Sequence, residues 1–202
     1  GVPVYSLYGA TRRPTPAELE GLDALVFDVQ DVGARFYTYI TTMGLAMQAA
    51  AEADLEFVVL DRPNPLGGNY VSGFTATPAH QSFVGKYPIP IAHGMTVGEL
   101  ARMIKGEAML PGLDDLDLTV VEMTGWDRSM RWPDTGRDWV APSPNLPTWE
   151  TALVYPGMCF FEGVRVNEGR GTDRPFLQIG LPWSRAAAHS VVYTLRARPL
   201  AG

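Results

Sequence analysis

The chain has 202 residues and a formal net charge of −6 at pH 7, with 46% hydrophobic and 19% charged residues. These proportions are typical of a soluble globular protein with a substantial core and disfavour disordered and fibrous classes. The negative charge, with no basic stripe, argues against a nucleic-acid partner, and no apolar run approaches the ~20 residues of a membrane span. The single cysteine, Cys159, cannot form an internal disulfide and is expected to be a small buried hydrophobe.

The first residues predict a strand followed by a short helix. Residues 2–7 are apolar and β-rich, and because the chain opens on them with neither Met nor a signal peptide, we expect a fragment or a mature chain. A short helix is predicted to begin next: Thr15 is its N-cap, Pro16 occupies its first position, and Glu18 completes a capping box with Thr15.

Two continuous apolar runs, residues 24–29 and 57–61, predict strands, and the first is of the kind that is buried on both faces of a parallel sheet. The segment between them predicts a helix that ends near Ala53, because apolar residues recur at helical spacing at Phe36, Ile40, Met43, Met47 and Ala50. Strand, helix and strand together make a βαβ unit.

The rest of the chain continues this alternation. A second capping box, Thr96 with Glu99, opens a predicted helix to about Gly106, and residues 118–123 predict a strand. Residues 125–147 are dense in Trp and Pro and predict an ordered, irregular loop, followed by a helix over residues 148–161 that is broken or ended near Pro156. A Gly-rich charged loop and a strand over residues 176–183 follow. We predict an α/β fold with a mostly parallel sheet and helices on both faces.

Polar side chains follow both strands of the βαβ unit. Gln30, Asp31 and Arg35 come after the first strand. An alternative without function is that Asp31 caps the following turn and Arg35 pairs with it. The second strand ends in Asp61, Arg62, Pro63 and Asn64, where the prolines stiffen the backbone, although a turn signal explains Asn-Pro equally well.

The carboxyl ends of neighbouring parallel strands meet at one edge of the sheet, where open α/β proteins bind ligands. Each strand here delivers an acid and an arginine to that edge. Arginine offers a planar fork to a carboxylate or phosphate, and the acids can bind hydroxyls or handle protons. The pattern indicates a polar, anionic small molecule.

Two further groups could contribute to a site. Glu168, in a Gly-rich stretch that follows Glu162, is a candidate general acid or base, although a surface turn explains this stretch too. His93 is a candidate that could equally be a structural hydrogen-bonding residue. One or two of the aromatic residues Tyr37, Tyr39, Trp126, Trp132 and Trp139 could stack on a sugar. The sequence lacks the GxGxxG, P-loop, HExxH and GxSxG motifs of common nucleotide-binding proteins, zinc proteases and serine hydrolases.

Six blocks in order, FDVQDVGARFYTYITTM, VLDRPNPLGG, PIPIAHGMTVGELA, APSPNLPT, TALVYPG and EGRGT, resemble the exo-β-N-acetylmuramidase family, the NamZ-type peptidoglycan hexosaminidases. The resemblance implies a Rossmann-like catalytic domain and a smaller C-terminal domain, with the active site in the cleft between them. It also implies release of N-acetylmuramic acid from the non-reducing end of peptidoglycan fragments in cell-wall turnover, without a cofactor. A small glycan or muropeptide is then the partner, and an extracytoplasmic or secreted location is favoured; the oligomeric state stays open.

Carried onto the matching positions, the resemblance gives Glu168 as the first candidate catalytic residue and Asp31 as the second. The lactyl carboxylate of muramic acid would bind Arg35, Arg62 or Arg170, and the sugar hydroxyls would bind Asp31, Asp61 and Asn64. Further substrate-binding candidates are Gln30, Tyr37, His93, Ser143 and Asn145.

The chain also departs from the family pattern. An upstream strand and a PEHG-type loop, whose Glu is a candidate acid, are absent; Asn167 replaces a Ser; and the sequence after Trp183 does not follow the family. We therefore expect a partial Rossmann-like catalytic domain over residues 1–183, with a divergent tail or the start of a truncated C-terminal domain over 184–202. This fragment could be inactive by itself.

Two rival functions stay open. A metal-assisted hydrolase would use Asp28, Asp31, Asp61 and His93, although strand alternation turns Asp28 away from Asp31. A muropeptide- or sugar-binding module would bind without hydrolysis.

Overall fold

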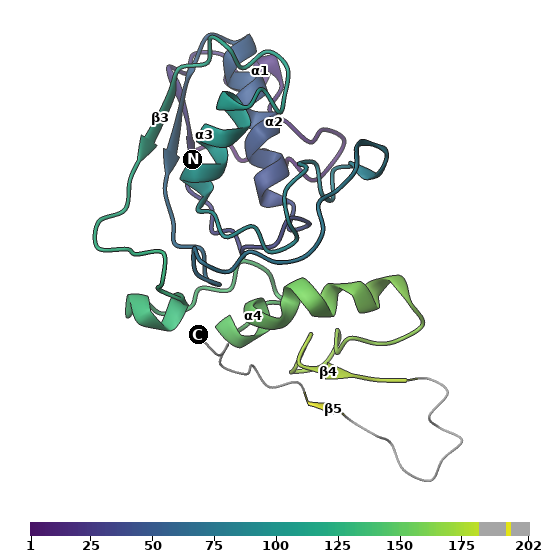
Figure 1. The fold of residues 1–202 in the computed structure, drawn as a ribbon. Helices are drawn as coiled ribbons and strands as arrows, with labels where there is room; N and C mark the ends of the chain where they lie inside the picture. Colours follow the sequence, from purple (N-terminus) through teal and green to yellow (C-terminus); the bar gives the residue numbers. More distant parts are fainter. Residues whose placement is uncertain (182–192, 195–202) are drawn as a thin grey trace. The chain divides into compact units, whose positions relative to one another are not determined.

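The computed structural model describes residues 1–181 and 193–194 and divides the chain into unit 1, Gly1–Met130, and unit 2, Arg131–Gly202 (Figure 1). The elements of unit 1 are α1 (Pro16–Leu19), β1 (Ala24–Phe27), α2 (Tyr39–Glu52), β2 (Glu56–Leu60), the 3-10 helix η1 (Pro78–His80), α3 (Val97–Gly106) and β3 (Leu118–Val121). The described elements of unit 2 are the 3-10 helix η2 (Trp132–Thr135), α4 (Trp149–Met158), the 3-10 helix η3 (Cys159–Gly163), β4 (Gln178–Ile179) and β5 (Tyr193–Thr194).

Three parallel strands form the sheet of unit 1 in the order β1-β2-β3. Val58 of the central strand lies beside Val26 on one side and Thr119 on the other. The helix α2 joins β1 to β2, so the predicted βαβ unit and the α/β fold class are confirmed. Because the strands are parallel, the segments that follow β1 and β2 leave the sheet at the same edge.

Helices α2 and α3 cover one face of this sheet (Figure 1). Four of the five apolar residues expected at helical spacing, Ile40, Met43, Met47 and Ala50, are wholly inaccessible in α2. The fifth, Phe36, precedes the helix and is half-buried. The four inaccessible residues pack in one hydrophobic cluster with alternate strand residues, Leu25, Phe27, Phe57, Val59, Leu118 and Val120. Burial of each large aliphatic side chain contributes about 1.5–3 kcal/mol to folding.

The opposite face of the sheet is more open. Val26 of β1 is 59% exposed and Val121 of β3 is 50% exposed. The expectation that the first strand is buried on both faces is therefore wrong. The physical reason is that β1 is an edge strand, and both helices that pack on the sheet in the described part of the chain lie on the other face.

The prediction of a strand over residues 2–7 is also wrong. These residues have no regular secondary structure, and Val2 and Val4 are almost fully exposed. Apolar, β-branched residues favour a strand only where a neighbouring strand accepts their backbone hydrogen bonds, and Pro3 in addition has no N–H to donate.

The predicted helix starts are confirmed. Thr15 N–H donates to Glu18 Oε2 (2.7 Å) at α1, and Thr96 N–H donates to Glu99 Oε2 (3.0 Å) at α3. Thr96 Oγ1 also accepts from Glu99 N–H (3.1 Å), which completes the capping box of α3. No helix in the described residues is both long and apolar enough to cross a membrane.

The irregular loop expected over residues 125–147 starts in unit 1 and continues into unit 2, where the Trp132 and Trp139 rings meet edge to face with centroids 5.1 Å apart. The helix α4 ends at Met158, two residues after Pro156, and continues into η3. The strand predicted over residues 176–183 is represented by β4, which pairs with β5 in an antiparallel bridge. Residues 182–183 and the predicted tail, apart from β5, lie outside the described residues.

Candidate functional site

Asp31 and His93 form a buried pair beyond the carboxyl end of β1. Their side chains are only 6% and 0% exposed, and Asp31 Oδ2 lies 3.3 Å from His93 Nε2. The same Oδ2 accepts from Gly33 N–H (2.7 Å), so Asp31 caps the following turn as the alternative interpretation expected. His93 Nδ1 accepts from Met95 N–H (3.2 Å), which places the proton of a neutral ring on Nε2, facing the carboxylate.

This pair retains unused hydrogen-bonding capacity. Among the described residues, Asp31 Oδ1 has no hydrogen-bond partner, and His93 Nε2 has only the 3.3 Å ion-pair contact with Asp31 Oδ2. Buried polar atoms without partners are costly and rare, and they often mark a functional site. In this arrangement the buried pair connects the loop after β1 to the segment before α3.

Gln30 and Asn64 join the loops at this edge through backbone carbonyls. Gln30 Nε2 donates to the Asp31 and Pro63 carbonyls (2.7 and 2.9 Å). Asn64 Nδ2 donates to the Met95 carbonyl (3.0 Å), and its Oδ1 accepts from Leu66 N–H (2.9 Å). Both side chains therefore shape the site, and of the two only Gln30 has an unpartnered oxygen, Oε1.

Asp61 is directed at the start of α3. Its Oδ1 accepts from Gly98 N–H (2.7 Å) and its Oδ2 accepts from Thr96 Oγ1–H (2.9 Å). Burial raises the pKa of Asp61, and the hydrogen bonds from Gly98 and Thr96 only partly oppose this shift. Asp61 therefore stabilises the first turn of α3, which occupies both of its oxygens.

Arg62 turns outward to an ion pair with Asp28, in which its Nε lies 2.8 Å from Asp28 Oδ1. Asp28, Asp61 and Asp31 thus have separate partners, and the described residues contain no group of three or more His, Cys, Asp or Glu side chains that could hold a metal ion. The four residues of the metal-assisted alternative do not converge.

Arg35 is buried and holds two distant segments together. Its Nη1 donates to the carbonyls of Phe74 (2.7 Å) and Ile89 (2.6 Å), so Arg35 does not pair with Asp31. Burial lowers the pKa of the Arg35 guanidinium, and no acidic side chain in the described part of the chain forms an ion pair with it. A hollow of about 420 Å³ lies beside Arg35, and its lining includes Phe74, Thr77, His80 and Gly85.

The aromatic candidates have different environments. Tyr37 and Tyr39, next to Arg35 in the chain, are partly buried and meet edge to face with ring centroids 4.8 Å apart. Trp132 is buried against Trp139 and belongs to the interior of unit 2. Tyr37 therefore remains a candidate for a sugar contact, whereas burial disfavours Trp132.

In unit 2, Glu168 is buried next to an arginine. The Glu168 side chain is 9% exposed and its Oε1 lies 2.9 Å from Arg170 Nε. Arg170 also pairs with Glu162 through Nη2. Glu168 is thus a buried carboxylate held by a cationic partner, while Arg170 already binds two carboxylates.

Ser143 and Asn145 lie in the irregular loop before α4. Ser143 Oγ accepts from Asn145 N–H (3.4 Å), and the Ser143 carbonyl accepts from Leu146 N–H (2.9 Å). They form a turn and are partly exposed. The structure therefore brings the unit 1 candidates into one set of loops and gives unit 2 a separate group around Glu168.

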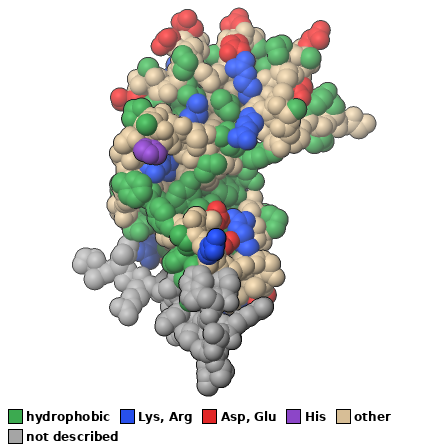
Figure 2. All heavy atoms as spheres, turned by 90° about the vertical axis from the view of Figure 1, so that its right-hand side faces the viewer, with side chains coloured by type: hydrophobic (Ala, Val, Ile, Leu, Met, Phe, Trp, Pro, Cys, Tyr) green, Lys and Arg blue, Asp and Glu red, His purple; other side chains and the backbone are tan. Residues whose placement is uncertain are grey.

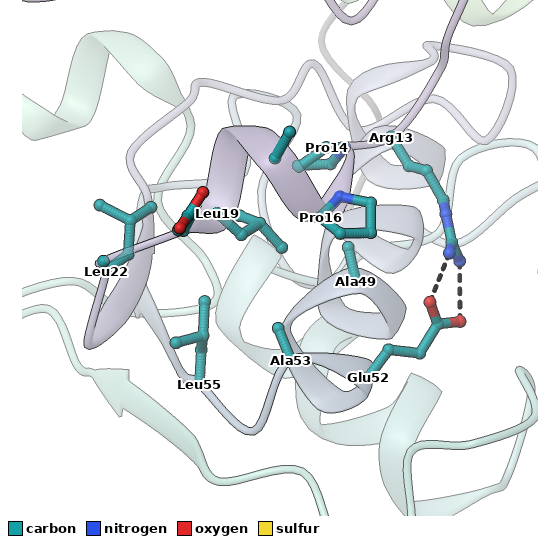
Figure 3. Close-up of a pocket in the computed structure, with 12 residues that line it drawn as sticks. Arg13, Pro14, Pro16, Leu19, Leu22, Ala49, Glu52, Ala53 and Leu55 are labelled. Carbon is teal, nitrogen blue, oxygen red and sulfur yellow. Dashed lines mark hydrogen bonds and ion pairs between the residues drawn. The ribbon is translucent and has the colours of Figure 1, made fainter.

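A second hollow, of about 500 Å³, lies at the opposite edge of the sheet. It is formed by α1, the end of α2 and the residues before β1 and β2. Figure 3 shows the Arg13–Glu52 ion pair on one side of it and Leu22 and Leu55 on the other. None of the predicted site residues lines this hollow.

The sequence analysis did not assign some of the residues that surround the candidates. Phe74, Thr77 and His80 line the hollow beside Arg35, and nothing in their local sequence connects them to it. Glu162 pairs with Arg170, eight residues further along the chain. The sequence places Glu162 near Glu168, but the opposite charges of Glu162 and Arg170 are the only feature of the sequence that indicates this pairing.

Family models and known proteins match nearly the whole chain. The model described as "Exo-beta-N-acetylmuramidase NamZ, N-terminal" matches residues 1–150, and its C-terminal counterpart matches residues 153–202. The C-terminal match includes the stretch after Trp183 that was expected to depart from the family. The predicted division into a partial catalytic domain over residues 1–183 and a tail over residues 184–202 stays a prediction.

The peptidoglycan beta-N-acetylmuramidase NamZ of Bacillus subtilis (strain 168) is 54% identical over 186 residues, which cover 92% of this chain and 44% of that protein. A solved DUF1343 family protein from Bacteroides fragilis NCTC 9343 matches with a TM-score of 0.84 and 46% sequence identity. The matched region covers 91% of this chain and 47% of the chain of that protein. A second one from the same organism has a TM-score of 0.78 and 44% identity, with coverages of 84% and 46%.

The chain thus spans less than half the length of each of these relatives. The match of the N-terminal family model to residues 1–150 nevertheless covers well over half of the 202 residues, and the fold of the solved relatives agrees with it. The chain belongs to the exo-β-N-acetylmuramidase NamZ family.

Proposed function

We propose that the protein is an exo-acting glycoside hydrolase that releases N-acetylmuramic acid from the non-reducing end of peptidoglycan fragments. The observation that carries this proposal is the buried Glu168 carboxylate paired with the partly exposed Arg170 in a chain of this family. The named activity of the 54% identical Bacillus subtilis relative supports the substrate class.

Glu168 is the proposed proton-transfer residue. Glycosidases generally use two carboxyl groups that flank the bond to be broken, with one donating a proton to the leaving oxygen. Asp31 is the second candidate from the sequence. Because Asp31 is buried against His93 and Gly33, its geometry supports a positioning role for the loops of unit 1 more than contact with the sugar.

Arg35 is the arginine that best suits the lactyl carboxylate of muramic acid. Arg62 is paired with Asp28, and Arg170 with Glu162 and Glu168, whereas Arg35 has no carboxylate partner in the described part of the chain. An unpaired buried charge is unfavourable, and an anion in the hollow beside it would offset that cost. Tyr37, two residues away, is the proposed sugar-stacking neighbour.

The distribution of acidic side chains supports the carboxyl edge as the anion-binding edge. Acidic side chains gather at the end of unit 1 that carries α1 (top of Figure 2). The exposed acids in the segments next to the amino ends of the strands include Glu20, Asp23, Asp54, Asp114, Asp115 and Asp117. An anionic muropeptide would be repelled from that end and from the hollow of Figure 3.

The test is an assay of the natural full-length protein on a muropeptide disaccharide with N-acetylmuramic acid at its non-reducing end. We expect release of free N-acetylmuramic acid, and a fall in kcat of roughly 10²- to 10⁴-fold for Glu168→Gln, the range that one proton-transfer group contributes. Glu150→Gln, at an exposed position of α4, is the matched control and should retain normal turnover.

Three results would contradict the proposal. Normal turnover in Glu168→Gln would remove its role. Loss of activity on treatment with EDTA, restored by a metal ion, would favour metal-assisted hydrolysis. Binding of the disaccharide by calorimetry without any hydrolysis would favour a muropeptide-binding module.

A further inference from the structure

Arg170 lies between two carboxylates. Its Nε is 2.9 Å from Glu168 Oε1, and its Nη2 donates to Glu162 Oε1. Glu168 is nearly buried, whereas the side chains of Glu162 and Arg170 are about a third and two fifths exposed. The guanidinium thus links an accessible carboxylate to a buried one.

Among the described residues, two further titratable groups, Cys159 and Tyr155, interact with this cluster, and both are neutral at physiological pH. Burial, the neighbouring charge of Glu162 and its hydrogen bond raise the pKa of Cys159 to about 11, and its Sγ–H donates to Glu162 Oε2 at 3.7 Å. Burial also raises the pKa of Tyr155 above its ordinary value. One cation is therefore shared by two anions, Glu162 and Glu168.

Glu162 fixes the cation. Burial works to lower the pKa of Arg170, but the hydrogen bond and charge of Glu162, with the charge of Glu168, outweigh it and raise the pKa. Arg170 also lies over the Phe176 ring, 5.0 Å from its centroid. The guanidinium is thus held by Glu162 on one side and by an aromatic ring, and it presents Nε to Glu168.

The backbone of Glu168 is fixed independently. Its carbonyl accepts from Phe176 N–H (2.6 Å), and Gly169, at φ +90°, accommodates the Arg174 carbonyl, which would lie 2.6 Å from any Cβ at that position. Asn167 bonds to Gly180 through both its N–H and its carbonyl. The Glu168 side chain therefore has a rigid base, and its carboxylate orientation depends on Arg170.

We propose that Glu162 is a positioning residue that acts through Arg170 to orient the Glu168 carboxylate and to limit the positive charge it experiences. This inference rests on the proposed function of Glu168. No sugar contact is assigned to Glu162.

The consequence is a change in the pH dependence of the reaction. Glu162→Gln removes a negative charge near Glu168 while Arg170 keeps its positive charge, so the ionised Glu168 carboxylate becomes more favourable. In the natural full-length protein, we expect the limb of the pH–rate profile that is lost in Glu168→Gln to move to lower pH by roughly half a unit to one unit. We also expect kcat to fall by about tenfold with little change in KM, because orientation of the reacting group is lost.

Two variants separate this role from a structural one. Glu162→Asp keeps the charge and should return the limb toward its wild-type position. Glu122→Gln, which breaks the exposed ion pair with Arg102 in unit 1, should leave the profile and kcat unchanged. Thermal unfolding of each variant shows whether lost activity reflects lost folding.

The outcomes distinguish this inference from the proposed function. A Glu162→Gln profile that coincides with the wild type, while Glu168→Gln is inactive, overturns the positioning role and leaves the hydrolase standing. Loss in Glu162→Gln as large as in Glu168→Gln also overturns it, because Glu162 would then itself react. Full turnover in Glu168→Gln, or no hydrolysis by the wild type, refutes the proposed function instead.

Discussion

Gly33 shows how a single residue without a side chain permits the candidate site to form. It has a φ of +77°, in the left-handed region that favours glycine, and a Cβ at this position would lie 2.4 Å from Asn64 Oδ1. That oxygen accepts from Leu66 N–H, and the Gly33 N–H donates to Asp31. The turn after β1 and the loop after β2 can therefore approach closely only with glycine here.

Gly33→Ala should destabilise the protein by roughly 2–4 kcal/mol, since backbone strain at positive φ adds to the displacement of Asn64. Urea unfolding measures this. Gly112→Ala is the matched control, because Gly112 has a φ of +78° but open space around its Cβ position. The control should cost only about 1 kcal/mol, and equal losses in the two variants would contradict the predicted clash with Asn64.

At the scale of elements, the start of α3 combines local and distant caps. Thr96 and Glu99 form the capping box within the helix segment, and Asp61 from the end of β2 accepts from Thr96 Oγ1–H and Gly98 N–H. The carboxylate favours the helix N-terminus, where free N–H groups and the helix dipole attract negative charge. Its burial opposes ionisation, and burial has the larger effect on its pKa.

Because the folded-state pKa of Asp61 is raised, the folded protein binds this proton more tightly than the unfolded chain. Relative to Asp61→Asn, the wild type should therefore lose stability as pH rises from about 4 through the raised pKa. Urea midpoints of both proteins between pH 4 and pH 7 measure the difference.

Asp127→Asn should change stability with pH in the opposite direction to Asp61→Asn. Hydrogen bonds from Ser129 lower the pKa of the exposed Asp127, so its contribution should be lost as pH falls below about 4. A stability difference for Asp61→Asn that is constant with pH, or that grows in favour of the wild type as pH rises, would contradict the argument.

Elements whose signals are local could be predicted from the sequence. The capping boxes, the stripe of α2 and the apolar runs of β1 and β2 each depend on residues within a few positions of one another, and all are confirmed. Residues 2–7 carry the same kind of signal but form no strand, since a strand also requires a partner that local sequence does not specify.

The candidate site could be predicted only as a set of residues at an edge of the sheet. The partners of its side chains are distant: Asp61 meets Thr96 across 35 positions, and Arg35 meets Phe74 and Ile89 across 39 and 54. Spacing along a strand indicates which residues leave the sheet together. It does not indicate that Asp61 turns to a helix or that Arg35 remains without a carboxylate.

For the whole molecule, the candidate residues fall in both units, and their environments suggest a division of labour. In unit 1, the described candidates mostly hold loops together, and Arg35 is a buried cation beside a hollow. In unit 2, Arg170 forms an ion pair with the buried Glu168, the residue of the proposed proton transfer. Under the proposed function, Arg35 is the candidate for the substrate anion and Glu168 the candidate for proton transfer, so substitutions of the two should change different kinetic constants.

Arg35→Met in the natural full-length protein should raise KM for the muramic acid substrate by roughly 10- to 100-fold, because charge-assisted bonds to a carboxylate are lost. A disaccharide with N-acetylglucosamine at the same end has no lactyl carboxylate, so its turnover should respond far less. Arg62→Met, which breaks the exposed Asp28 pair, should change KM by less than about twofold. Since Arg35 also binds the Phe74 and Ile89 carbonyls, thermal unfolding and Arg35→Lys, which keeps the charge, separate folding from recognition. An equal effect of Arg35→Met on both disaccharides would show that Arg35 supports the loops without recognising the lactyl group.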